Sequence, residues 1–88
     1  MKLGPCIITK VLLPTDTKDA RVKATYKRDS STTWSKTVAW NTDIEDYENH
    51  YKAAKLLIDT WPLNEEHTWS FIARGHDQFH YYFVATYE

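Results

Sequence analysis

The feature that most constrains the fold is a change of hydrophobic period along the chain. Residues 6–40 and 68–87 contain segments that alternate apolar and polar side chains with the two-residue period of a strand, whereas residues 43–61 space apolar side chains three and four apart, as one face of a helix requires. A single amphipathic helix between two sets of strands buries its apolar face against the sheet that they form. The sequence therefore predicts an α+β fold, βββαββ in order, in which an antiparallel sheet of about five strands carries one amphipathic helix on one face.

Five segments are predicted to be strands: 6–13, 21–28, 34–40, 68–74 and 79–87. Pro14 ends the first strand because proline has no N–H to donate to a sheet, and residues 75–78 are predicted to form the tight turn before the last strand. The second segment predicts two distinct faces. Its apolar face is Val22, Ala24 and Tyr26, and its basic face is Arg21, Lys23, Thr25 and Lys27.

The helix is predicted over residues 43–61. Its apolar stripe consists of Ile44, Tyr47, Tyr51, Ala54, Ile58 and Trp61, widened by Ala53 and Leu57. Thr42 and Glu45 have the spacing of a capping box, and acidic residues follow in the first turn, where the helix dipole favours them. Pro62 cannot continue the helix, so we expect the helix to end before it.

Length and composition indicate a small protein without disulfide bonds. The 88 residues are expected to form a single domain, 1–88, and the one cysteine, Cys6, rules out an internal disulfide framework. No apolar run approaches the ~20 residues of a transmembrane helix, and residues 1–5 do not begin a signal peptide. We therefore expect a cytoplasmic protein that does not interact with membranes.

The net charge of −1 hides a strong asymmetry. Residues 1–40 hold eight basic and three acidic residues, a net charge of +5, whereas residues 41–66 hold seven acidic and two basic residues, a net charge of −5. We expect a bipolar surface that steers charged partners and favours self-association. The low net charge argues against binding extended nucleic acid, but a compact anion needs only two or three cations.

No motif for catalysis, metal binding or cofactor binding is found. With two glycines the chain has no phosphate-binding loop, and the four histidines lack the spacing of metal ligands. Cys6 lies in an apolar segment, where a cysteine is usually inert packing. Acidic residues at the start of the helix are interpreted as complementing its dipole. We therefore expect a protein that is not an enzyme and has no cofactor.

Two groups of residues are candidates for binding. The basic face offers Arg21, Lys23 and Lys27 for phosphates, with Trp40 or Tyr82 to stack on a base. Asn49 and His50 lie beside the apolar stripe of the helix, and two interpretations are open for them. They tether the helix to the loop at 15–18, or they contact a ligand by hydrogen bonds.

Two short segments resemble a pattern in phage and prophage proteins. Residues 15–24 read Thr-Asp-Thr-Lys-Asp-Ala-Arg-Val-Lys-Ala, and residues 48–54 read Glu-Asn-His-Tyr-Lys-Ala-Ala. Together they resemble the pattern Thr-x-Thr-Lys-x-x-Arg-x-Lys-Ala plus Glu-Asn-His of short phage proteins, which often end in an aromatic hairpin. Some of these look similar to phage anti-defence proteins of the anti-Thoeris type.

The resemblance implies a non-enzymatic anti-defence protein that sequesters a small anionic nucleotide signal in the host cytoplasm. Arg21 and Lys23 would match the basic residues of the first segment, and Asn49 and His50 the polar pair of the second. The alternative is a protein-interaction inhibitor that binds and blocks a host defence complex, such as one of the CRISPR type. Surplus aromatic residues and free sheet edges lead us to expect a homo-oligomer, a dimer or larger, in either case.

Overall fold

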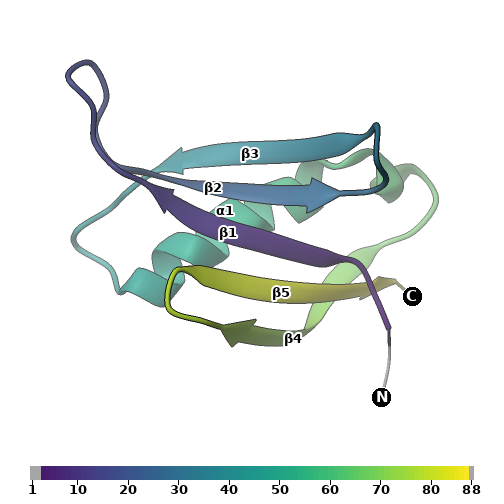
Figure 1. Ribbon diagram of the computed structural model, residues 1–88. Helices are drawn as coiled ribbons and strands as arrows, with labels where there is room; N and C mark the ends of the chain where they lie inside the picture. The colour runs from purple at the N-terminus through teal and green to yellow at the C-terminus, as the bar shows by residue number, and fades with distance from the viewer. Residues whose placement is uncertain (1–2, 88) are drawn as a thin grey trace.

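The segments with a two-residue period form strands, and the segment with a helical period forms a helix. A computed structural model describes residues 3–87. Its elements are β1 (Cys6–Leu12), β2 (Arg21–Lys27), β3 (Thr33–Ala39), α1 (Asp46–Thr60), a 3-10 helix η1 (Pro62–Glu65), β4 (Trp69–His76) and β5 (His80–Tyr87). This confirms the predicted α+β fold with the order βββαββ (Figure 1).

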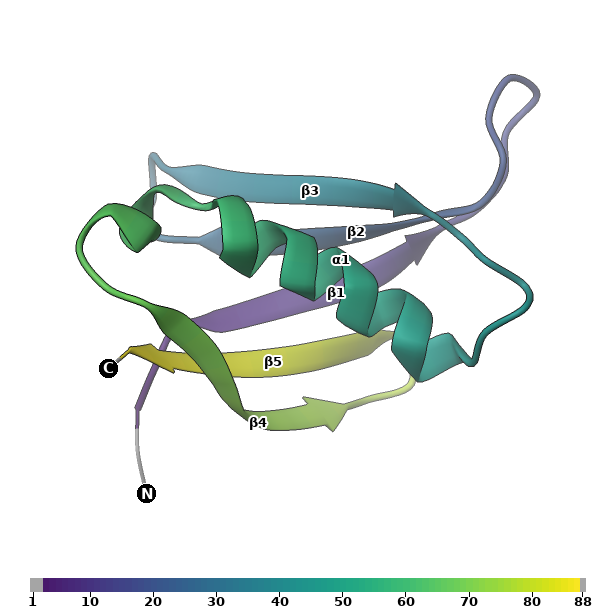
Figure 2. The same ribbon diagram turned by 180° about the vertical axis from the view of Figure 1, so that it is seen from behind.

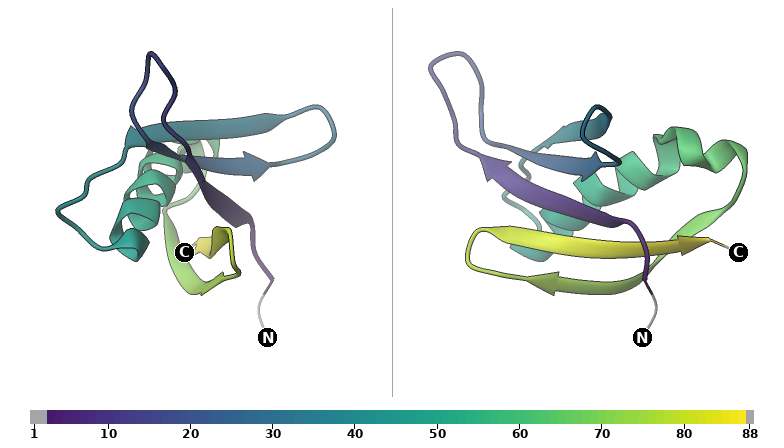
Figure 3. Two further views of the ribbon diagram at one scale, coloured as in Figure 1. Left: turned by 60° about the vertical axis from the view of Figure 1, so that its left-hand side comes forward. Right: turned by 45° about the vertical axis from the view of Figure 1, so that its right-hand side comes forward.

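The five strands form one antiparallel sheet in the order β3-β2-β1-β5-β4. The first strand is central, because it pairs with β2 on one side and with the last strand on the other, where Ile7 lies opposite Phe83. The segment that joins β1 to β2 stands away from the rest of the molecule (Figure 3).

The helix covers one face of the sheet, and the register decides which side chains it meets. Residues opposite each other in a sheet point to the same side, so Val22 shares the helix side with its partners Val11 and Val38. The buried core consists of Ile7, Val22, Ala24, Phe83 and Ala85 from the sheet and Ala53, Ala54, Leu57, Ile58 and Trp61 from the helical layer. The helix crosses the sheet diagonally and packs chiefly against β2 and β3 (Figure 2).

The helix differs from its prediction at both its start and its buried face. It begins at Asp46 rather than at residue 43, and its N-cap, Glu45, makes no capping bond through its side chain. The predicted capping box of Thr42 and Glu45 is therefore wrong. Residues 42–44 form a turn instead, in which the backbone N–H of Asp43 donates to the side-chain oxygen of Asn41.

The buried face of the helix is rotated relative to the predicted stripe. Tyr51 is 38% exposed, while the polar Asn49 and His50 are 1% and 3% exposed. Both polar side chains have hydrogen-bond partners inside the protein, and burial of satisfied polar groups is tolerated. No helix within residues 3–87 is long and apolar enough to cross a membrane.

The last hairpin also departs from its prediction. β4 continues through Gly75, opposite Tyr82, to His76, so the predicted turn at 75–78 is wrong in its first half. The turn is held by the carboxylate of Asp77, which accepts hydrogen bonds from the backbone N–H groups of Phe79 and His80. β4 also contains an unpredicted bulge between Phe71 and Ala73.

We predict that Asn49→Ala destabilises the fold by about 2 to 4 kcal/mol, because it removes two short hydrogen bonds to the backbone of Asn41 and leaves buried polar groups unpaired. Urea denaturation measures this loss. The matched control is Glu48→Gln, its exposed neighbour, which should change the free energy of unfolding by less than about 0.5 kcal/mol. Equal stability of the two variants would contradict the assigned role of Asn49.

Candidate functional site

The face of the sheet that the helix leaves uncovered is strongly basic. No strand of the described sheet contains an aspartate or a glutamate. By register, the outward side chains of the three central strands are Cys6, Ile8, Lys10 and Leu12 on β1, Arg21, Lys23, Thr25 and Lys27 on β2, and His80, Tyr82, Val84 and Thr86 on β5. We call this surface the open face. The basic side of β2 thus faces away from the helix.

Three of these residues form a row across the strands. Lys10 lies directly opposite Lys23 on one side and opposite His80 on the other. Like charges placed opposite each other in a sheet repel, and neither lysine forms an ion pair within residues 3–87. The two lysines therefore carry positive charges that no ion pair within residues 3–87 compensates, and an anionic group would relieve their repulsion.

The carboxylate of Asp77 contacts one end of this row. Its Oδ1 lies 3.4 Å from Nδ1 of His80, and its Oδ2 accepts a hydrogen bond from the Tyr82 hydroxyl. That hydroxyl, followed by the backbone N–H groups of Phe79 and His80, holds the pKa of Asp77 well below its usual range, and the same bond raises the pKa of Tyr82. Asp77 thus stays ionised and fixes the Tyr82 ring on the open face.

Arg21 borders the open face where β2 begins. It lies opposite Leu12 on β1 and Ala39 on β3, and its side chain is half-buried. Its Nε is buried without a hydrogen-bond partner among the described residues. A buried N–H without a partner carries a desolvation cost, which an acceptor on a bound partner would remove.

Asn49 lies on the other side of the sheet and serves as a tether. The backbone N–H of Asn41 donates to its side-chain oxygen at 2.8 Å, and its amide nitrogen donates to the carbonyl oxygen of Asn41 at 2.9 Å and of Glu45 at 3.3 Å. The side chain of Asn49 therefore fixes the backbone at Asn41, which precedes the helix, to the first turns of the helix.

His50 joins the helix to the central strand. Its Nδ1 lies 2.7 Å from the hydroxyl of buried Thr9, which also donates to the carbonyl oxygen of Tyr81 at 3.4 Å. Desolvation by burial lowers the pKa of His50. The charge of Asp46 raises this pKa and that of His80 lowers it further, but both effects are smaller than that of burial. The tether was predicted to reach the loop at 15–18, but it reaches β1, because the helix crosses directly over this strand.

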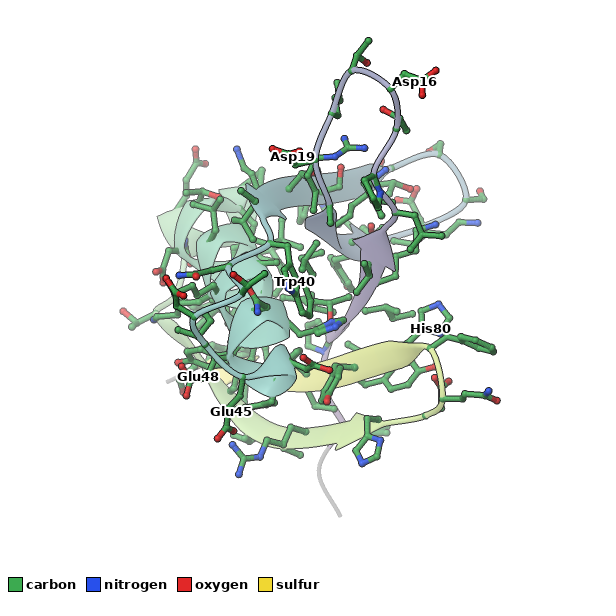
Figure 4. All side chains as sticks on the ribbon, turned by 90° about the vertical axis from the view of Figure 1, so that its left-hand side faces the viewer. Asp16, Asp19, Trp40, Glu45, Glu48 and His80 are labelled. Atoms are coloured by element: carbon green, nitrogen blue, oxygen red, sulfur yellow. The ribbon has the colours of Figure 1, made fainter. Side chains whose placement is uncertain are left out.

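Trp40 belongs with this buried pair rather than with the open face. It is half-buried and its ring meets His50 edge-on, with centroids 6.2 Å apart. Figure 4 shows Glu48 on the helix and Glu45 just before it, to one side of the sheet, and His80 on the other side. The seven predicted site residues therefore form two groups with the sheet between them. Arg21, Lys23, Lys27 and Tyr82 are outside, and Trp40, Asn49 and His50 are inside.

Concave surface lies on the helix side. A cavity of about 440 Å³ is lined by Tyr47, Tyr51, Lys55, Ile58 and residues 70–74 with Phe83, and a second of about 390 Å³ is lined by Tyr47, Arg74, Gly75, His76 and Tyr81. The sequence had assigned the two tyrosines to the core. The signal that could have found these residues is the number of aromatic side chains, 13 in 88 residues, which exceeds what one small core can enclose.

The charged and aromatic side chains of these surfaces are suited to recognition of a partner or ligand. Burial raises the pKa of the Cys6 thiol, the opposite of what a nucleophilic cysteine needs. Within residues 3–87 no group of three or more histidine, cysteine or acidic side chains is placed to hold a metal ion.

We predict that stability falls as the pH is lowered from about 7.5 to 5.5. Because burial lowers the pKa of His50, the unfolded chain takes up a proton near pH 6.5 that folded His50 resists, and the free energy of unfolding decreases by at most about 1.4 kcal/mol per pH unit. Urea denaturation at several pH values measures this dependence. His50→Gln should flatten it, whereas His67→Gln, at an exposed position, should not. An unchanged dependence in His50→Gln would contradict the assignment.

Comparison with protein-family models, with curated proteins and with solved structures finds no match to this chain. The functional argument therefore depends on the geometry of the open face and of the helix side.

Proposed function

We propose that this protein is a non-enzymatic binding protein that docks the open face of its sheet onto an acidic surface of a partner protein. The observation that carries the proposal is the charge of that face. Lys10, Arg21, Lys23 and Lys27 project from neighbouring strands that contain no carboxylate. Such a surface attracts an acidic partner and repels a basic one.

The shape of the open face favours a protein partner over a small molecule. Small ligands bind in concave sites, and none of the four cavities identified among residues 3–87 is lined by Arg21, Lys23 or Lys27. Single-stranded nucleic acid requires several stacking aromatic rings, but Tyr82 is the one aromatic side chain among the outward residues of the three central strands.

The composition of the open face also fits a protein interface. Ile8, 41% exposed, lies opposite Tyr82, so apolar and aromatic surface sits among the cations. Tyrosine and arginine dominate interface energetics. With strands about 4.8 Å apart and a rise of about 3.3 Å per residue, the outer surface of the whole five-stranded sheet measures roughly 24 Å by 25 Å. The open face is its central part, so an interface with the ~800 Å² that each partner usually contributes would include the edge strands as well.

The resemblance to phage proteins extends the proposal to the identity of the partner. It would make this chain an anti-defence inhibitor that blocks a host defence complex. Sequestration of a small anionic nucleotide and assembly into a homo-oligomer remain predictions. Asn49 and His50 are buried on the helix side of the sheet, whereas the predicted basic residues lie on the open face. Sequestration by all the predicted residues would therefore need a ligand that contacts both faces of the sheet.

The test is capture of an acidic host protein by the immobilised chain. We expect Lys10→Glu combined with Lys23→Glu to weaken binding about 100-fold, because two attractions become repulsions, and we expect added salt to weaken binding of the original chain. Lys52→Glu is the matched control, since it reverses an exposed lysine on the helix and should leave binding unchanged.

Native mass spectrometry of the same samples separates the alternatives. Equal capture by the double variant and the original chain would contradict the proposal. Retention of a molecule of a few hundred daltons, without a host protein and lost in Arg21→Ala, would support sequestration instead.

A further inference from the structure

A groove runs between the helix and the edge strand β4. The helix crosses the sheet diagonally toward β3 (Figure 2) and meets β4 at few residues. Side chains of the helix and of β4 therefore line an open cavity between them. The walls are aromatic. Tyr51 from the helix meets Phe71 from β4 at 6.0 Å and Phe83 from β5 at 6.1 Å between ring centroids, and the last two are 5.3 Å apart.

The bulge in β4 places one arginine in this groove. Phe71 pairs with Ala85 on the helix side, and strict alternation from Phe71 would turn Arg74 toward the open face. The bulge adds one residue before Ala73, and Arg74 pairs instead with Phe83, whose side chain is in the core. Bulges commonly redirect side chains at functional sites, and this one aims Arg74 at Tyr47.

The guanidinium of Arg74 is held in place but not neutralised. It stacks over the ring of Tyr47 at 4.8 Å and donates to the Tyr47 hydroxyl at 2.7 Å. Arg74 forms no ion pair in the part of the chain that the structure describes, whereas Lys55, the other cation of the 440 Å³ cavity, is paired with Asp59 at 3.0 Å. The remaining N–H groups of Arg74 are therefore available to an anion.

We propose that this groove binds a small planar ring that carries an anionic group, with the ring against Tyr51 and Phe71 and the anion on Arg74. The cavities on the two sides of Arg74, of about 440 and 390 Å³, are within the range of small-molecule sites. No carboxylate lines either cavity, so charge complementarity selects an anion. This site is separate from the open face and does not depend on the function proposed for it.

The probe for this proposal is adenosine 5′-monophosphate, which combines a flat ring with a phosphate. Titration followed by NMR of the backbone amides should move the signals of Tyr51, Arg74 and Gly75. Adenosine and inorganic phosphate, each offering one half of the probe, should bind at least 10-fold more weakly. Equal binding of adenosine, or shifts confined to the strands of the open face, would overturn the proposal.

Two arginine variants complete the test. Arg74→Gln should weaken binding of the probe about 10-fold or more through loss of a charge-assisted hydrogen bond. Arg28→Gln is the matched control, since Arg28 also stacks on an aromatic ring, that of Trp34 at 5.7 Å, but outside the groove. Equal weakening in both variants, or displacement of the probe by dimerisation through the groove, would contradict the assignment. Lys10→Glu with Lys23→Glu should leave binding of the probe unchanged.

Discussion

One helix cannot cover a five-stranded sheet, and most features of this molecule follow from that mismatch. An α-helix is about 10 Å wide with its side chains, whereas five strands at about 4.8 Å spacing are more than twice as wide. The helix therefore packs chiefly on β2 and β3, leaves one face of the sheet to solvent, and leaves the groove beside β4. Cations lie on the open face and aromatic rings line the groove. Both surfaces are left uncovered because a single helix is too narrow for the sheet.

Two buried polar residues decide how the helix sits. Asn49 and His50 occupy positions that a purely apolar stripe would have given to Tyr47 and Tyr51, and their hydrogen bonds to Asn41 and Thr9 compensate for their burial. The buried face of the helix is thereby rotated, and the two tyrosines line the groove at the margin of the core. The pair for which the sequence left both a tether and a ligand contact open thus positions the residues of another candidate site.

The sequence predicted the fold and the basic side of β2 because both depend on short-range periodicity. Val22 and Lys23 alternate within one strand, and no distant partner is needed to assign their faces. The rotation of the helix could not be predicted, because the burial of His50 depends on a hydroxyl 41 residues away. The bulge in β4 could not be predicted for a similar reason. It is a shift in register with β5, and the residues Phe71, Ile72 and Ala73 carry no local sequence signal for it.

The central position of β1 also has a consequence for the order of folding. β1 can pair with β2 early, but its other edge stays open until β5, the last strand of the described chain, is available. The contacts between β1 and β5 span most of the chain, and such high contact order slows folding. During synthesis the nascent chain would present an unpaired strand edge to its surroundings. The charged Lys10 in the middle of that strand opposes pairing of the open edge with another chain at this stage.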